Sequence, residues 1–187
     1  MDSKIAQFQK ELNQLTIDYH ELFAELSSEA LNWKPNAQTW SIGQIIDHII
    51  KTNESYIPSF EGLQKGTYKA SWVRHFSFFL RFFGNFVLKG VEPSRQKKIK
   101  TFPVWEPTAS TVADDIVQKF GTHQKELCAK IIENQDFILR GAIISSPANR
   151  IIVYTLERAI EIMIAHEKRH LNQAEEILIH IHNQNKY

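Results

Sequence analysis

The sequence has few of the features that mark secreted, membrane-spanning or highly charged proteins. Its 187 residues include one cysteine, Cys128, which cannot form a disulfide within the chain. Residues 1–7 lack the apolar core of a signal peptide, so we expect a cytoplasmic protein. The 22 lysines and arginines nearly balance the 21 acidic residues, which leaves a net charge of +1. That balance excludes the strong electrostatic field typical of proteins that bind nucleic acid or acidic lipid.

Long uninterrupted hydrophobic runs are also missing. The most apolar stretch, residues 72–91, is interrupted too often for a membrane-spanning helix, at Arg74, His75, Arg81, Gly84, Asn85 and Lys89. A basic run at residues 95–100 is short and more typical of a solvated loop than of a nucleic-acid site. We therefore expect neither a nucleic acid nor a membrane among the partners.

The sequence does contain apolar residues at helical spacing in four long segments. The first segment spans about residues 3–27. The second opens with a capping box formed by Ser41 and Gln44, which satisfies backbone N–H groups at the start of a helix. Its apolar stripe continues as far as Leu63. Strand signals are scarce, so the pattern favours an all-α fold.

The third helix is expected after Pro107, beginning near Thr108 or Ser110. The connection that precedes it includes the aromatic-rich residues 72–91 and is too apolar for a solvated loop. An extra helix packed on the other four is the first expectation for this insertion. A subunit interface and a hydrophobic ligand pocket stay open as alternatives, because large apolar patches usually have partners.

The fourth helix is expected to begin at Ser146, as an N-cap, with Pro147 at the first helical position. Its apolar stripe continues to about residue 182. Together the four segments predict one all-α domain over residues 1–187, an antiparallel four-helix bundle with an aromatic-rich helical insertion between its second and third helices.

Two histidines, His166 and His170, lie one turn apart on the same face of the last predicted helix. Such a pair can bind a metal if a third ligand is near, and His48 on the second helix could face it. Since the chain has eight histidines, the spacing can also arise by chance. His123 lies on an apolar stripe and is expected to be a core histidine with its hydrogen bonds satisfied.

The same residues fit the string H-E-x-x-H of zinc proteases, with Glu167 as the acid. The context argues against a protease, because Lys168 and Arg169 fill positions that are usually uncharged there. Only 17 residues follow His170, and Gln173 stands where an extended motif would have glycine. No upstream strand is predicted that could bind an extended peptide.

A match over almost the whole chain carries more information. Trp40-Ser41, followed after six intervening residues by His48, resembles the first signature of the DinB/YfiT-like family. His166-x-x-x-His170-x-x-Gln173 resembles the second signature of that family. The order of the two motifs and their predicted helix positions agree with the family pattern.

The resemblance implies a four-helix bundle with a divalent metal held by His48, His166 and His170. Zinc or nickel is expected before iron or manganese. Members commonly form homodimers, and several subgroups are metal-dependent S-transferases or isomerases that use a low-molecular-weight thiol. We therefore expect a metal-dependent enzyme acting on a small molecule, as an S-transferase, hydrolase or isomerase.

Glu167 is the candidate catalytic residue, as a general base or as a partner of a metal ligand. An ion pair with a neighbouring cation is the alternative for this residue. For the whole protein the alternative is a non-catalytic helical bundle that binds a ligand or partner, with a structural metal or none.

Overall fold

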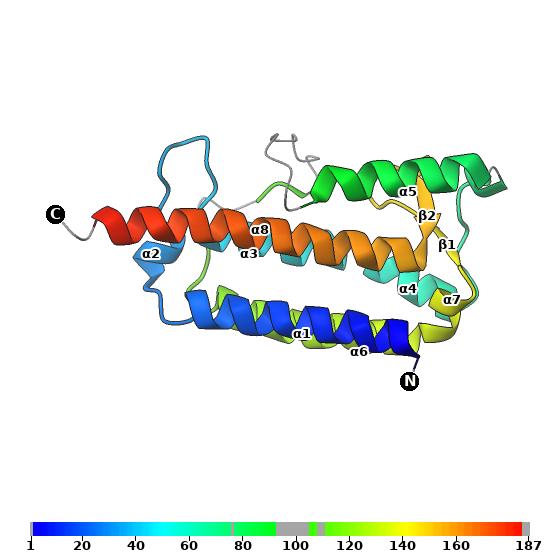
Figure 1. Cartoon of the computed structure of the whole chain (residues 1–187), viewed down its shortest axis with the longest axis horizontal. Coiled ribbons are helices and arrows are strands. Elements are labelled where there is room, and N and C mark those ends of the chain that lie inside the picture. Colours follow the sequence, from blue (N-terminus) through cyan, green and yellow to red (C-terminus); the bar gives the residue numbers. More distant parts are fainter. Residues whose placement is uncertain (1, 76, 93–104, 108–110, 185–187) are drawn as a thin grey trace.

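The computed structural model describes residues 2–75, 77–92, 105–107 and 111–184, and most of these are helical (Figure 1). The elements are α1 (Ser3–Phe23), α2 (Ser28–Asn32), α3 (Ile42–Glu54), α4 (Ile57–Gln64), the 3-10 helix η1 (Trp72–His75), α5 (Ser77–Val91), α6 (Ile116–Glu133), α7 (Gln135–Leu139), β1 (Ile143–Ser145), β2 (Val153–Thr155) and α8 (Leu156–Gln184).

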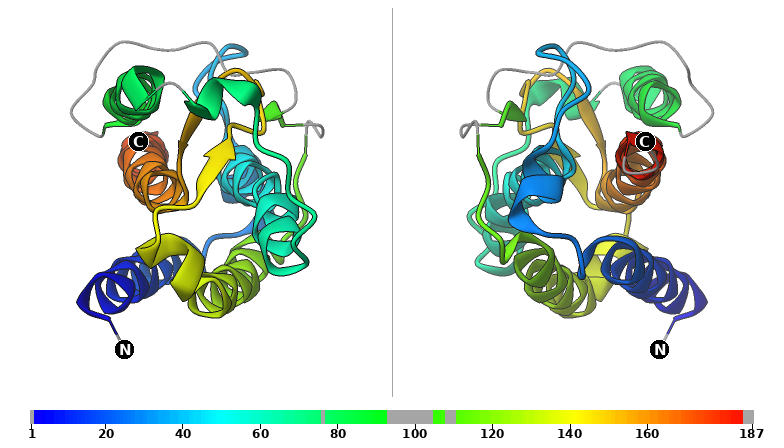
Figure 2. Two further views of the ribbon diagram at one scale, coloured as in Figure 1. Left: turned by 90° about the vertical axis from the view of Figure 1, so that its right-hand side faces the viewer. Right: turned by 90° about the vertical axis from the view of Figure 1, so that its left-hand side faces the viewer.

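Four helices, α1, α3, α6 and α8, surround a common core. Helix α1 contacts α6 and α8, and α3 contacts the same two helices, so the four form a ring that is visible end-on in Figure 2. Each helix turns its apolar stripe inward, as the helical spacing predicts. The fully buried side chains at the centre include Tyr19, Phe23, Phe60, Phe120 and Leu127.

The starts of the first two long helices follow from local capping. The Asp2 carboxylate accepts a hydrogen bond from the Lys4 backbone N–H at the start of α1. At the start of α3, the Ser41 hydroxyl accepts from the Gln44 N–H, and the Gln44 side chain accepts from the Ser41 N–H. The predicted capping box is therefore confirmed, and it fixes the start of the helix that carries His48.

The second helix is interrupted, which the sequence analysis did not predict. Helix α3 ends at Glu54, and α4 starts at Ile57 with a proline in its first turn. Pro58 has no N–H to donate, and in a continuous helix its ring would clash with the carbonyl of Glu54 four residues earlier. The Tyr56 N–H instead donates to the Asn53 carbonyl at 3.0 Å, in a tight turn.

The third long helix begins later than predicted. Residues 108–110, where the start was expected, lie outside the described residues, but residues 111–115 are not helical and α6 begins at Ile116. The side chain of Asn32 explains part of this difference, because it bonds both backbone groups of Val112 at 2.7 and 3.0 Å. Those groups are thereby unavailable to a helix.

The predicted start of the fourth helix is wrong as well. The segment around Pro147 forms a β-hairpin, in which Ile144 pairs with Tyr154, and α8 begins only at Leu156. The Ser146 N–H donates to the Ile152 carbonyl at 2.7 Å and closes the hairpin. β-branched and aromatic residues before and after the turn fit a pleated strand better than a helix. The fold is therefore mostly helical with one small two-stranded sheet.

The aromatic-rich segment forms η1 and α5, and α5 packs on α8 and β2 outside the ring of four helices (Figures 1 and 2). Gly84 is buried there, and an added Cβ would lie 3.1 Å from the Arg158 side chain. Phe82 and Phe86 are 51% and 65% exposed on the other face. The basic run at 95–100 lies outside the described residues. Among the described helices, none is both long and apolar enough to cross a bilayer.

Candidate metal centre

The structure brings the three predicted histidines together between α3 and α8. The Nε2 atoms of His48 and His166 are 3.1 Å apart, and those of His170 and His166 are 3.0 Å apart. The three residues are separated by up to 122 positions in the sequence, yet their ligand atoms all lie within 4.8 Å of one another. We call these residues the site histidines.

The separations fit a shared divalent ion. Imidazole nitrogens bind zinc at about 2.0–2.1 Å, and tetrahedral geometry then places two such nitrogens about 3.3 Å apart. The observed 3.0 and 3.1 Å differ from this value by only a few tenths of an ångström. Among the described residues, the group contains no aspartate, glutamate or cysteine, so the donor set is three imidazoles. Three protein donors leave at least one coordination position for another molecule.

The surroundings keep the site histidines neutral, the form that binds a metal. Burial lowers the pKa of His48, and burial together with the charges of its two neighbours lowers the pKa of His166 well below its usual range. Burial, followed by the nearby His48, lowers the pKa of His170 to about 3. Protons therefore compete weakly for these nitrogens at neutral pH.

The orientation of His48 is fixed by its neighbours. Its Nδ1 lies 2.6 Å from the Trp105 carbonyl oxygen. A carbonyl can only accept, so Nδ1 carries the proton and Nε2 presents its lone pair to the other site histidines. The Trp40 ring lies against His48, with ring centroids 4.9 Å apart, and also stacks near His170 at 6.4 Å. An apolar wall and a fixed tautomer are typical surroundings of a metal-binding histidine.

The carboxylate of Glu167 lies in the interior and is not part of the group of ligand atoms. Its Oε1 accepts a hydrogen bond from Asn53 Nδ2 at 2.7 Å, and its Oε2 accepts one from Gln124 Nε2 at 2.6 Å. Burial raises the pKa of Glu167 to about 7, while these two amides act in the opposite direction. Its carboxylate therefore bonds two amides, and the cation beside it in sequence, Lys168, pairs with Glu11 at 2.6 Å.

His123 is buried on α6, as predicted, but its Nε2 has no hydrogen-bond partner within the described part of the chain. It is not a member of the metal-ligating group there. Sequence reasoning missed Asn53, Gln124 and Trp105, because each contributes through a contact that joins distant segments. For Asn53 and Gln124, the one available signal in the sequence was a polar residue on the apolar face of a predicted helix.

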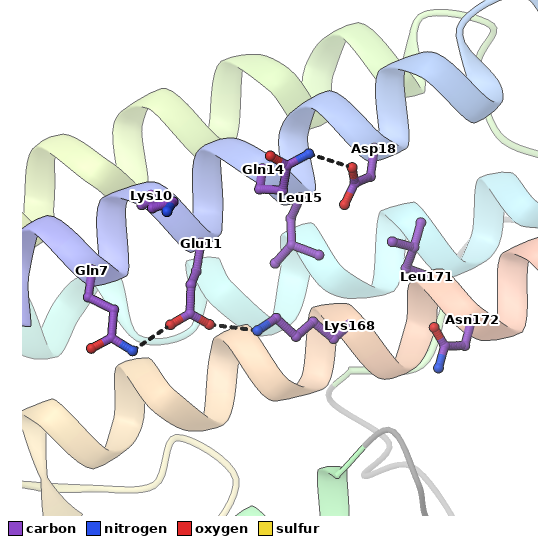
Figure 3. Close-up of a pocket in the computed structure, with 9 residues that line it drawn as sticks. All are labelled: Gln7, Lys10, Glu11, Gln14, Leu15, Asp18, Lys168, Leu171 and Asn172. Atoms are coloured by element: carbon purple, nitrogen blue, oxygen red, sulfur yellow. Dashed lines mark hydrogen bonds and ion pairs between the residues drawn. The ribbon is translucent and has the colours of Figure 1, made fainter.

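A separate groove of about 600 Å³ lies between α1 and α8. Figure 3 shows its lining residues, among them the Glu11–Lys168 ion pair and a hydrogen bond from Gln14 to Asp18 at 2.8 Å. None of the site histidines lines this groove.

A family model described as the DinB superfamily matches residues 11–174, a range that contains all three site histidines. The chain belongs to the DinB superfamily. The DinB superfamily is typically metal-binding, which agrees with the convergence of the three imidazoles. Searches of the curated proteins and of the solved structures returned no significant match to this DinB superfamily chain.

Proposed function

We propose that this DinB superfamily protein is a divalent-metal-dependent enzyme that acts on a small molecule at an open three-histidine site. The observation that supports the proposal is the convergence of three Nε2 atoms. That of His166 lies 3.1 Å from the Nε2 of His48 and 3.0 Å from the Nε2 of His170. Catalytic zinc sites typically have three protein ligands and one open position, whereas structural sites have four. The donor set of three favours the catalytic class.

A bound ion would supply a Lewis acid that lowers the pKa of a thiol or a water in the open position. The chain's own residues prepare that position. The Trp105 carbonyl holds the His48 tautomer, and burial keeps all three rings neutral. Trp40 covers the rings on one side and excludes water there. These roles require no change of protonation in the site histidines during turnover.

The reaction class follows from what such a site can activate. A thiolate produced near neutral pH would attack an electrophilic small molecule, as in an S-transferase that uses a low-molecular-weight thiol. Activation of water would give a hydrolase, and an isomerase is the third version. Histidine donors suit zinc or nickel, with iron or manganese as further candidates. We also propose that α1, α3, α6 and α8 form the antiparallel four-helix bundle of the family, and that the protein is a homodimer.

Metal content tests the proposal directly. Elemental analysis of the protein purified without chelators should find about one divalent ion per chain, and His48→Ala should lose most of it. His180→Ala is the matched control, because His180 is exposed on the same helix as two site histidines and is outside the ligand group. Equal metal in the wild type and in His48→Ala would refute the ligand set.

Assays then separate the reaction classes. The metal-loaded protein should consume a thiol in the presence of an electrophile, and His48→Ala should not. Absence of turnover with any thiol would reject the transferase version and leave the hydrolase and isomerase versions to be assayed. Similar melting temperatures with and without metal would agree with a catalytic ion, since a structural ion contributes folding free energy.

A further inference from the structure

Glu167 is hydrogen-bonded to three neighbouring helices at the level of the site histidines. Its carboxylate accepts from Asn53 on α3 and from Gln124 on α6. Its backbone carbonyl accepts from the Tyr19 hydroxyl on α1 at 3.2 Å. With α8 itself, this one residue connects all four helices of the ring in Figure 2. Glu167 is fully buried, as are Tyr19 and Asn53.

The contact with Asn53 bears directly on the position of His48. His48 and Asn53 are both on α3, five positions apart, which corresponds to a rise of about 7.5 Å along the helix. On α8, Glu167 is the residue directly after His166. The bond from Asn53 Nδ2 to Glu167 Oε1 at 2.7 Å therefore fixes how far α3 is shifted along α8. Such a shift determines whether His48 reaches the His166–His170 pair.

The same contacts argue against proton transfer by Glu167. A general base must come within hydrogen-bond distance of the proton that it removes. Both carboxylate oxygens already accept amide hydrogen bonds, and neither belongs to the group of metal-ligating atoms. The carboxylate is directed to α3 and α6.

We propose that Glu167 is a positioning residue, whose hydrogen bond from Asn53 sets the register between α3 and α8 and so brings His48 to the His166–His170 pair. The metal readouts of this inference rest on the proposed function. Gln124 has a different role, because it joins Glu167 to α6, which carries no site histidine. The two amides are thus a matched pair: both are buried, both donate to Glu167, and one is on the helix that carries a ligand.

The test compares Asn53→Leu with Gln124→Met, two apolar substitutions of similar side-chain length that remove one amide donor each. Co²⁺ is titrated into each metal-free protein while the visible absorption spectrum is recorded. Asn53→Leu should weaken Co²⁺ binding about tenfold or more, as observed when partners of metal ligands are removed, and should change the spectrum. Gln124→Met should keep the wild-type spectrum and bind within about threefold of the wild type.

Substitution at Glu167 itself separates positioning from acid–base chemistry. The amide oxygens of Asn53 and Gln124 have no partner within the described part of the chain, so either amide can turn over and accept from a glutamine at position 167. Glu167→Gln should therefore keep Co²⁺ affinity and spectrum, whereas Glu167→Leu should lose both. A Glu167→Gln protein with native Co²⁺ binding but no turnover would overturn the inference in favour of an acid–base role.

A metal-free readout separates this inference from the proposed function. In the metal-free protein, NMR should detect contacts between the rings of His48 and His166, whose centroids are 5.0 Å apart. These contacts should vanish in Asn53→Leu and persist in Gln124→Met. If Asn53→Leu does not fold, Asn53→Ser takes its place. Equal effects of the two amide substitutions would refute the positioning role, even if Co²⁺ binds. Retained ring contacts without any Co²⁺ binding would instead refute the proposed function.

Discussion

The hydrogen bond between Tyr56 and Tyr154 should be asymmetric in its contribution to stability. Their hydroxyl oxygens are 2.7 Å apart, and both side chains are buried. Tyr154 also shares a hydrogen bond with the Ser146 side chain, whereas the hydroxyl of Tyr56 has no second partner among the residues that the structure describes. Burial raises the pKa of both phenols, so both are protonated at neutral pH. The two phenylalanine substitutions should therefore cost different amounts of free energy.

The magnitudes follow from which group is left without a partner. Tyr56→Phe leaves Tyr154 bonded to Ser146, so its cost should be that of one net hydrogen bond, about 1 kcal/mol. Tyr154→Phe removes both hydrogen bonds and also leaves the Tyr56 hydroxyl buried without a partner, which should cost about 3 kcal/mol. The double substitution removes the unpartnered hydroxyl as well. It loses only the two hydrogen bonds and should cost about 2 kcal/mol, which gives a coupling energy of about 2 kcal/mol.

Urea unfolding of the metal-free proteins, followed by circular dichroism, measures these free energies. The slope of the unfolding free energy against urea should be the same in all four proteins, since the surface exposed on unfolding is similar. Equal costs for the two single substitutions, or a double substitution that costs their sum, would refute the reasoning.

Two further predictions concern a pair of glycines and one histidine. Gly121→Ala, within α6, should stabilise the protein by about 0.5–1 kcal/mol in the same urea assay, because alanine favours the helical conformation more than glycine does. The new methyl would contact only a Thr16 methyl on α1, at 4.0 Å. Gly43→Ala should not stabilise the protein, because its Cβ would lie 3.2 Å from a backbone oxygen of Leu31; a gain at Gly43 equal to that at Gly121 would contradict the packing. The pKa of His170 is lowered to about 3, so the metal-free protein should lose stability as the pH falls below about 6.5, where the unfolded chain takes up a proton that the folded chain does not. His170→Asn should lessen that loss by about 1.4 kcal/mol per pH unit, and an unchanged pH dependence of unfolding would contradict it.

The parts of the fold that local sequence determines were predictable. Helix α1 begins at Ser3 as expected, and the capping box of Ser41 and Gln44 begins α3. The site histidines were predictable because helical phase places His166 and His170 on one face, while the family motif identified His48. Each of these features depends on residues within about one turn of one another or on a recognisable spacing.

The parts that were missed depend on contacts between distant segments. The β-hairpin ending at Thr155 needs a partner strand, so the run around Ile152 could be assigned to a helix from its apolar residues alone. Pro147 was interpreted as a first-turn proline, although it lies in the turn between the strands. The bond between Asn53 and Glu167 spans 114 residues, and no local pattern indicates it.

The contacts between α3 and the C-terminal part of the chain show why the candidate site depends on register. Going up the chain from His48 to Asn53 and Tyr56, the partners are His166, Glu167 and then Tyr154. Tyr154, on β2, precedes His166 and Glu167 in the sequence, so the C-terminal part runs back as α3 runs forward, as two antiparallel segments require. A shift of α3 by one turn would move it about 5.4 Å along α8, more than the 3.1 Å between the Nε2 atoms of His48 and His166. The two buried hydrogen bonds and the convergence of the imidazoles therefore exist in one register only. A substitution that loosens that register should reduce metal binding even where no ligand is changed.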